Sequence, residues 1–168
     1  MTKDKLMVDI ETLGLDVESA ILSIGAVRFD SGGLGETFYR EIDLVTCQDA
    51  GLEIDADTLQ WWLTEADTEL PLGDNHLENV LREFRDFALS ANEVWSNSPS
   101  FDCEHLEHAF DAVGLDVPWT FYEERDVRTL KELPIPVEIE QDGTEHNALD
   151  DAVYQARIVS QTLKEMKA

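Results

Sequence analysis

Two carboxylates spaced two residues apart are the first feature of this sequence that could do chemistry. In VDIET, Asp9 and Glu11 alternate with Val8 and Ile10. Successive side chains of a strand point to opposite faces, so the two acids leave one face with about 6 to 7 Å between their Cα atoms. They could hold a cation, or they could be solvated on an exposed face. Burial of two unpaired carboxylates is costly without a cation, and this pair alone leaves both interpretations open.

Further acids fall where two helices are expected to begin. Asp102 follows the turn SPSF, and Asp150 and Asp151 come shortly after His146 in HNALDDA. Aspartate in the first turn of a helix is favoured by the helix dipole whatever its function, and a single loop histidine is commonly a surface residue. Each position taken alone therefore has a structural interpretation as good as a catalytic one.

The overall charge is strongly negative. The sequence has 37 acidic against 12 basic residues, a formal net charge of -25. This acidity is explained either by solubility or by adaptation to high salt, where the Debye length falls to about 3 Å at 1 M and self-repulsion is screened. Because the acids are spread along the whole chain, we favour the high-salt hypothesis. Cys47 and Cys103 lack the spacing of a zinc site or disulfide framework, so we interpret them as ordinary thiols.

Hydrophobic periodicity predicts one α/β domain over residues 1–168. Alternation predicts a strand at 5–11, a continuous apolar run predicts a strand covered on both faces at 21–29, and a returning strand at 36–42 completes a meander. Short strands are expected at 93–97 and 119–124. Helices are expected at 55–66, at 75–91, after a cap at Ser100 up to Gly114, at 126–133 and from about Asn147 onward.

The segment 134–145 is expected to be a loop. PIPVEIEQDGTE contains two prolines and a glycine, which is typical of a mobile loop. No apolar run approaches the length of a membrane span, and the N-terminus shows no signal-peptide organisation. We therefore expect a soluble, cytoplasmic protein without a membrane partner.

Taken together, these motifs resemble the DEDDh family of 3′→5′ exonucleases, and the similarity is greatest to the small single-domain branch that contains ribonuclease AS and ribonuclease T. The matching segments occur in the same order along most of the chain: MVDIETLG, ILSIGAVRFD, LQWWL, the 95–102 segment, RDVRTL and HNALDDAVYQAR. The resemblance implies a ribonuclease-H-like α/β fold. We expect a mixed five-stranded sheet, with a three-stranded antiparallel meander and two parallel strands, flanked by helices.

The resemblance also assigns roles at the site. It implies that Asp9, Glu11, Asp102 and Asp151 bind two divalent cations and that His146 is the general base. The family spacing of histidine, four residues and aspartate selects Asp151, and we interpret its neighbour Asp150 as support for the helix. Hard oxygen ligands suit Mg²⁺ or Mn²⁺, and four clustered carboxylates would repel one another without cations. We interpret the 134–145 loop as a lid that carries His146.

The substrate implied by the resemblance is the 3′ end of single-stranded nucleic acid, with RNA favoured over DNA and a homodimer as the working form. Arg125, Arg128 and Lys131 form the densest basic group, which is either a phosphate contact or the exposed face of a helix. Aromatic side chains, Trp95 among them, could stack a base or pack in the core. The candidate substrate-binding residues are Thr12, Leu13, Ser23, Trp61, Trp62, Asn97, Phe101 and Arg128.

Two other classes of function fit the sequence less well. A catalytically silent ribonuclease-H-like module could use its acidic surface to bind a basic partner, but such a module has no need of all five site residues. A calcium-binding acidic domain requires a DxDxDG-type loop, and the sequence contains none. Metal-dependent 3′→5′ exonucleolysis is therefore the function that the sequence predicts.

Overall fold

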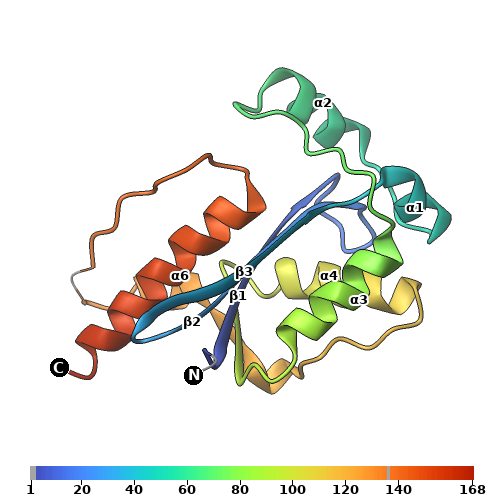
Figure 1. The fold of residues 1–168 in the computed structure, drawn as a ribbon. Helices are drawn as coiled ribbons and strands as arrows, with labels where there is room; N and C mark the ends of the chain where they lie inside the picture. The colour runs from blue at the N-terminus through green and yellow to red at the C-terminus, as the bar shows by residue number, and fades with distance from the viewer. Residues whose placement is uncertain (1–2, 136) are drawn as a thin grey trace.

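The computed structural model describes residues 3–135 and 137–168. A five-stranded sheet with the order β3-β2-β1-β4-β5 lies at its centre (Figure 1). β1 pairs antiparallel with β2 and β2 with β3, while β4 runs parallel to β1 and β5 to β4. The predicted mixed sheet is confirmed. The strands are β1 Lys5–Thr12, β2 Ile21–Asp30, β3 Gly33–Glu41, β4 Glu93–Ser96 and β5 Glu124–Asp126.

Helices cover both faces of this sheet. The long C-terminal helix α6 packs across β1, β2 and β3, and α3 and α4 lie on the opposite face (Figure 1). α1 and α2 lie beyond one end of the sheet, at the upper right of the view. The helices are α1 Leu44–Asp49, α2 Ala56–Thr64, α3 Leu77–Ala88, α4 Asp102–Ala112, α5 Val127–Lys131 and α6 Ala148–Glu165, with a 3-10 turn η1 at Phe121–Glu123.

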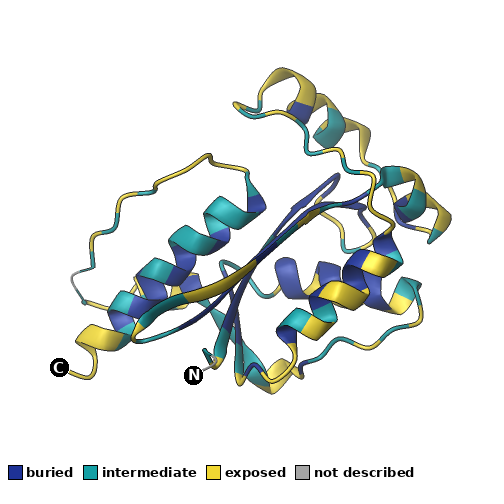
Figure 2. Cartoon of the chain, in the orientation of Figure 1, coloured by how far each residue is buried: buried dark blue, intermediate teal, exposed yellow. Residues whose placement is uncertain are grey.

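The alternation of β1 divides the core in two. Leu6, Val8 and Ile10 enter the larger core, which is shared with α3 and α4, whereas Met7 points to a smaller core beneath α6. β2 is buried along its length up to Asp30, as its continuous apolar run predicts, and Figure 2 shows buried residues concentrated along the sheet and the inward sides of the helices. Central burial of β1 is what places its two acids inside the protein.

Two local predictions are wrong, and one helix was not predicted. The strand expected at 119–124 is instead the turn η1 followed by β5, because Thr120 and Glu123 cap each other and close the turn. Helix α1 was not predicted, since Cys47 is its one buried residue and six residues give no period. Ser100 does not cap α4: the cap position is Phe101, and Ser100 Oγ shares a 2.9 Å hydrogen bond with Ser98 Oγ.

No helix in the described ranges is both long enough and apolar enough to cross a membrane. The segment 134–145 forms no helix or strand in the residues that the structure describes, and most of those residues are exposed. Its end is held close to α6, because the backbone N–H of Thr144 donates to Asp150 Oδ2 at 2.9 Å. This attachment fixes where His146 enters the site.

Candidate active site

Strand β1 and helix α6 are brought close together by a glycine. Asp9 lies opposite Gly25 in the β1–β2 register. A Cβ atom at Gly25 would overlap the backbone of Ala148 and Leu149 at the start of α6. Because Gly25 has no side chain, the first turn of α6 can lie directly over the strand pair that carries Asp9.

The first turn of α6 then brings a third carboxylate to the pair on β1. Asn147 caps the helix, its Oδ1 accepting from Leu149 N and Asp150 N at 3.1 and 3.0 Å. One carboxylate oxygen from each of three side chains lies within 4.8 Å of the others; these are Asp9, Glu11 and Asp151. Asp150 lies outside this cluster and holds Thr144, so the structure separates the two adjacent aspartates.

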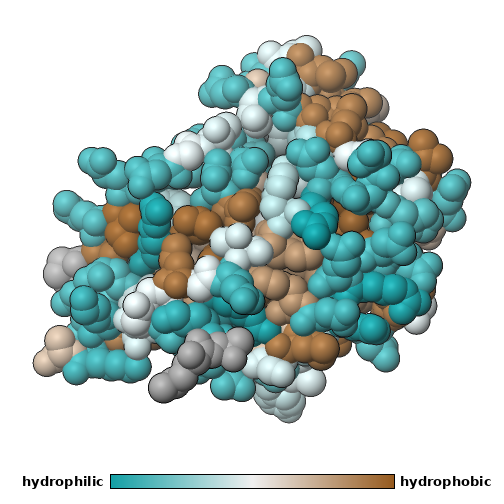
Figure 3. Space-filling view, in the orientation of Figure 1, coloured by the Kyte–Doolittle hydropathy of each residue, from teal (hydrophilic) through white to brown (hydrophobic). Residues whose placement is uncertain are grey.

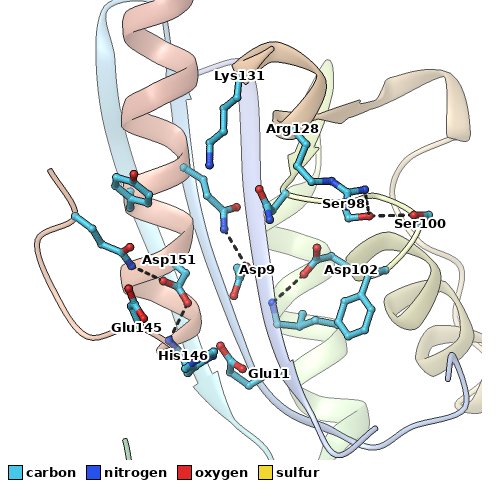
Figure 4. Close-up of a pocket in the computed structure, with 16 residues that line it drawn as sticks. Asp9, Glu11, Ser98, Ser100, Asp102, Arg128, Lys131, Glu145, His146 and Asp151 are labelled. Atoms are coloured by element: carbon cyan, nitrogen blue, oxygen red, sulfur yellow. Dashed lines mark hydrogen bonds between the residues drawn. The ribbon is translucent and has the colours of Figure 1, made fainter. Parts of the chain in front are cut away.

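Asp102 approaches the same cluster from the opposite side. It is the first residue of α4, is 4% exposed, and accepts a 3.2 Å hydrogen bond from Ile10 N. Figure 4 shows Asp9 between Asp151 and Asp102, with Glu11 and His146 beside them. All five predicted site residues line one cavity of about 730 Å³. Segments from both ends and the middle of the chain thus converge on one site.

Burial and mutual repulsion disfavour the ionised forms of these carboxyl groups. Burial raises the pKa of Asp9 well above its usual range, and the charges of Asp102, Glu11 and Asp151 add to the effect. The pKa of Glu11 rises to about 8 through burial and then through Asp151 and Asp102. Burial also raises the pKa of Asp102 to about 7 and that of Asp151 above its usual value. A hard divalent cation is the partner that such an oxygen cluster fits.

His146 is held at the edge of the carboxylate cluster. Its backbone lies in the left-handed region with φ 61°, and its N–H donates to Asp151 Oδ2 at 3.1 Å. The imidazole ring meets the Trp61 ring edge-on, with 5.1 Å between centroids. Gln141, in the loop before His146, donates to the other oxygen of Asp151 at 2.7 Å. The loop end and the carboxylate are therefore fixed to each other.

A second, more apolar cavity adjoins the first. Its volume is about 640 Å³, and Glu11, Phe101 and His146 line both cavities. Trp61 is 38% exposed at its wall, whereas Trp62 is buried and its Nε1 donates to Thr12 O at 3.2 Å. Apolar side chains gather over α2 and α1 on the face shown in Figure 3. Through its shared lining residues, the apolar cavity lies directly beside the acids.

The remaining predicted contact residues divide into two groups. Asn97 and Arg128 line the acidic cavity, and the Arg128 guanidinium donates to Ser98 Oγ at 2.9 Å. Leu13 and Ser23 are fully buried and line neither cavity, so as substrate contacts they stay predictions from the sequence alone.

Two other positions from the sequence analysis also lie away from the cavity. Arg125 bonds to the carbonyl oxygens of Tyr122 and Glu124 and does not line the acidic cavity, whereas Lys131 does. Trp95 is buried in the core beneath α6, so it packs there and does not stack a base.

One residue of this cavity was missed. Gln155 lies four residues after Asp151 on α6, and its Nε2 donates to Asp9 Oδ1 at 3.1 Å. Residues four apart on a helix share a face, so the position of Asp151 was a signal that could have found it. The apolar positions of this helix predict its packing face, and they do not by themselves predict a site residue at Gln155.

The strand order β3-β2-β1-β4-β5 and the meeting of acids from β1, α4 and α6 in one cavity match the ribonuclease-H-like fold of DEDDh nucleases. Solved structures share this fold. A zinc-bound E. coli exonuclease I complex with single-stranded DNA matches 99% of this chain and 41% of its own, with a TM-score of 0.71 and 14% identity. The nuclease domain of 3′hExo, a DEDDh family member bound to rAMP, matches 97% and 93%, with a TM-score of 0.68 and 13% identity.

Exonuclease X in complex with 5′ overhanging duplex DNA matches 96% of this chain and 90% of its own, with a TM-score of 0.58 and 16% identity. Residues 4–163 match the 3′-5′ exoribonuclease Rv2179c-like domain, and the chain belongs to this family. A comparison with curated proteins finds no match. The chain spans about two fifths of the exonuclease I structure, 41%, so the likeness to that larger protein concerns the fold.

Proposed function

We propose that this protein is a metal-dependent 3′→5′ exonuclease that shortens single-stranded nucleic acid, RNA in preference to DNA, and releases nucleoside 5′-monophosphates. One observation carries the proposal: carboxylate oxygens of Asp9, Glu11 and Asp151 lie within 4.8 Å of one another, and Asp102 and His146 line the same cavity. The family membership and the DEDDh fold support it.

Four carboxylates would hold the cations, which we propose to be two Mg²⁺ or Mn²⁺ ions. Asp9 and Glu11 offer oxygens from β1, Asp102 from α4 and Asp151 from α6. The raised pKa values of Asp9 and Glu11 agree with this proposal, since burial first and repulsion by the neighbouring carboxylates second disfavour the ionised forms when no cation is bound. When bound, a cation pair supplies an activated water and stabilises the departing 3′ oxygen.

We propose that His146 takes the proton of the attacking water. Its backbone is tied to Asp151, and its ring is held against Trp61 at the junction of the two cavities. A positioned imidazole can act as a general base. We propose that the 134–145 loop acts as its lid, because Gln141 joins that loop to Asp151.

The two cavities divide the recognition of a 3′-terminal nucleotide. The exposed face of Trp61 in the apolar cavity would stack the terminal base, while Arg128 and Lys131 in the acidic cavity would contact phosphates and offset the acidic surface. The description of the family as exoribonuclease supports the preference for RNA. We also propose a homodimer from the family resemblance, and a cytoplasmic location and a single domain over residues 1–168 from the sequence pattern.

A labelled single-stranded RNA tests this function. With Mg²⁺ or Mn²⁺, a 5′ label should yield a ladder of products shortened from the other end, and a 3′ label should leave at once as a labelled mononucleotide. A chelator should stop both. Asp102→Asn should reduce the rate by more than the roughly 10- to 100-fold that loss of a ligand's partner costs. Asp111→Asn, an exposed position on the same helix, should cleave normally.

Shortening of the RNA from both ends at equal rates, or cleavage that persists in Asp102→Asn, would refute the assignment. The same assay on DNA of matching sequence measures the substrate preference. Complete inactivity on RNA and DNA, with cations bound, would favour the catalytically silent interaction module.

A further inference from the structure

One neutral side chain in the acidic cavity has no part in the proposed chemistry. Gln155 is 7% exposed and lies one helical turn after Asp151 on α6. Its Nε2 donates to Asp9 Oδ1 at 3.1 Å, which is the dashed contact drawn to Asp9 in Figure 4. The amide therefore links α6 to one of the carboxylates that we assign as cation ligands.

The other half of this amide is available as an acceptor. Gln155 Oε1 is buried and has no hydrogen-bond partner among the described residues. Rotation of the amide would place Oε1 against the Asp9 oxygen, which has no hydrogen to donate in the ionised form that binds a cation. Buried polar atoms in folded proteins nearly always have a partner. Because Gln155 lines the acidic cavity, a donor brought in with a ligand is the natural partner.

We propose that Gln155 is a positioning residue of this site. Its nitrogen sets the orientation of Asp9, and its free carbonyl oxygen accepts a hydrogen bond from an O–H group in the cavity. That group is either a water of a bound cation or a hydroxyl of the nucleotide sugar. The inference rests on the proposed function for the identity of these ligands, and both sources share the same chemistry.

A purely structural role makes a different prediction. If Gln155 served only to join α6 to β1, its replacement would change the unfolding temperature and leave ligand affinity unchanged in the folded protein. Gln161 provides a matched control on the same helix, because its amide donates to Glu165 at 2.6 Å and it does not line the acidic cavity. Replacement of Gln161 removes a hydrogen bond of a side-chain amide without changing the acidic cavity.

The test measures binding by calorimetry for wild type, Gln155→Leu and Gln161→Leu. Mn²⁺ is titrated alone, and then AMP and 2′,3′-dideoxy-AMP are titrated at saturating Mn²⁺. Loss of a partner of a metal ligand typically weakens binding about 10- to 100-fold. We expect Gln155→Leu to lose this much affinity for Mn²⁺, because Asp9 loses its partner on α6. If the donor to Oε1 is a sugar hydroxyl, a further loss should appear for AMP and not for the dideoxy nucleotide.

Unchanged affinities in folded Gln155→Leu would overturn the proposal, as would an equal loss for both nucleotides at unchanged Mn²⁺ affinity. If Gln155→Leu does not fold, Gln155→Met undergoes the same titrations, and failure of both to fold would show a purely structural residue and overturn the proposal. Because binding is measured and not cleavage, a wild type that binds Mn²⁺ without cutting RNA would refute the proposed function separately.

Discussion

Acidification should stabilise this protein when divalent cations are removed. The pKa of Glu11 is about 8 in the folded protein against 4.5 as its ordinary value. A carboxyl group with a raised folded pKa contributes stability that is fully present below its unfolded pKa and is lost as pH rises through its folded pKa. The contribution of Glu11 should therefore decline between about pH 5 and pH 9, and Asp102, with a pKa of about 7, acts in the same direction.

The size of the effect follows from these values. One pKa unit corresponds to about 1.4 kcal/mol, so lowering the pH from about 8 to about 6 should add roughly 2 kcal/mol to the free energy of unfolding through Glu11. For a chain of this length, that is a rise of about 4–8 °C in the unfolding temperature. Saturating Mg²⁺ should raise the stability at pH 8 and flatten the pH dependence, because the ionised carboxylates then have a partner.

Thermal unfolding followed by circular dichroism in chelator measures this directly. The control is Glu11→Gln, which keeps the shape of the side chain and the rest of the acidic surface. It should exceed wild type in stability by roughly 2 kcal/mol more at pH 8 than at pH 6 and equal it only below about pH 4.5, where Glu11 is protonated in both states, so the change with pH isolates Glu11 from the general relief of negative charge. A difference that does not change with pH, or a wild type that is the more stable protein at pH 8 in chelator, would refute the electrostatic account.

Three further predictions concern the helix contact, the apolar cavity and the surface charge. Gly25→Ala should push the start of α6 away from β1, because the added Cβ overlaps the backbone there. Such overpacking should lower the free energy of unfolding by about 1–3 kcal/mol, which thermal unfolding measures. A rate assay at temperatures where the variant remains folded should show slower cleavage. Trp61→Ala should weaken binding of a single-stranded 3′ end by about 1–3 kcal/mol in a titration, whereas Leu63→Ala, an exposed control on the same helix, should not. If the acidity is a salt adaptation, cleavage should rise with added KCl in a rate series, and steady inhibition would contradict that hypothesis.

The central strand could be predicted from the sequence because its alternating pattern depends only on neighbouring residues. The alternation around Asp9 and Glu11 determines which side chains share a face, and the structure has both acids on the side of α6. The start of α6 was also predictable, because Asn147 is a strong cap and the apolar positions after it repeat at helical spacing. Motif order then allowed the prediction that Asp102, distant in sequence, belongs to the same site.

What the sequence did not predict depends on tertiary contacts. Ser23 looked like a candidate contact because of its place in a matching motif, but its depth in the sheet depends on how helices cover β2. The adjoining apolar cavity exists because Trp61 faces outward while its neighbour Trp62 points in toward Thr12. Gln155 gains its importance only when α6 lies over Asp9, which requires the absent side chain of Gly25.

The account depends most on the cavity between β1, α4 and α6 being a cation site. An anomalous-scattering map from crystals soaked in manganese tests this most directly. We predict two peaks in that cavity, in contact with oxygens of Asp9, Glu11, Asp102 and Asp151. In crystals of Asp102→Asn, at least one of the two peaks should be absent. A map with no peak there, in crystals that take up manganese elsewhere, would contradict the account.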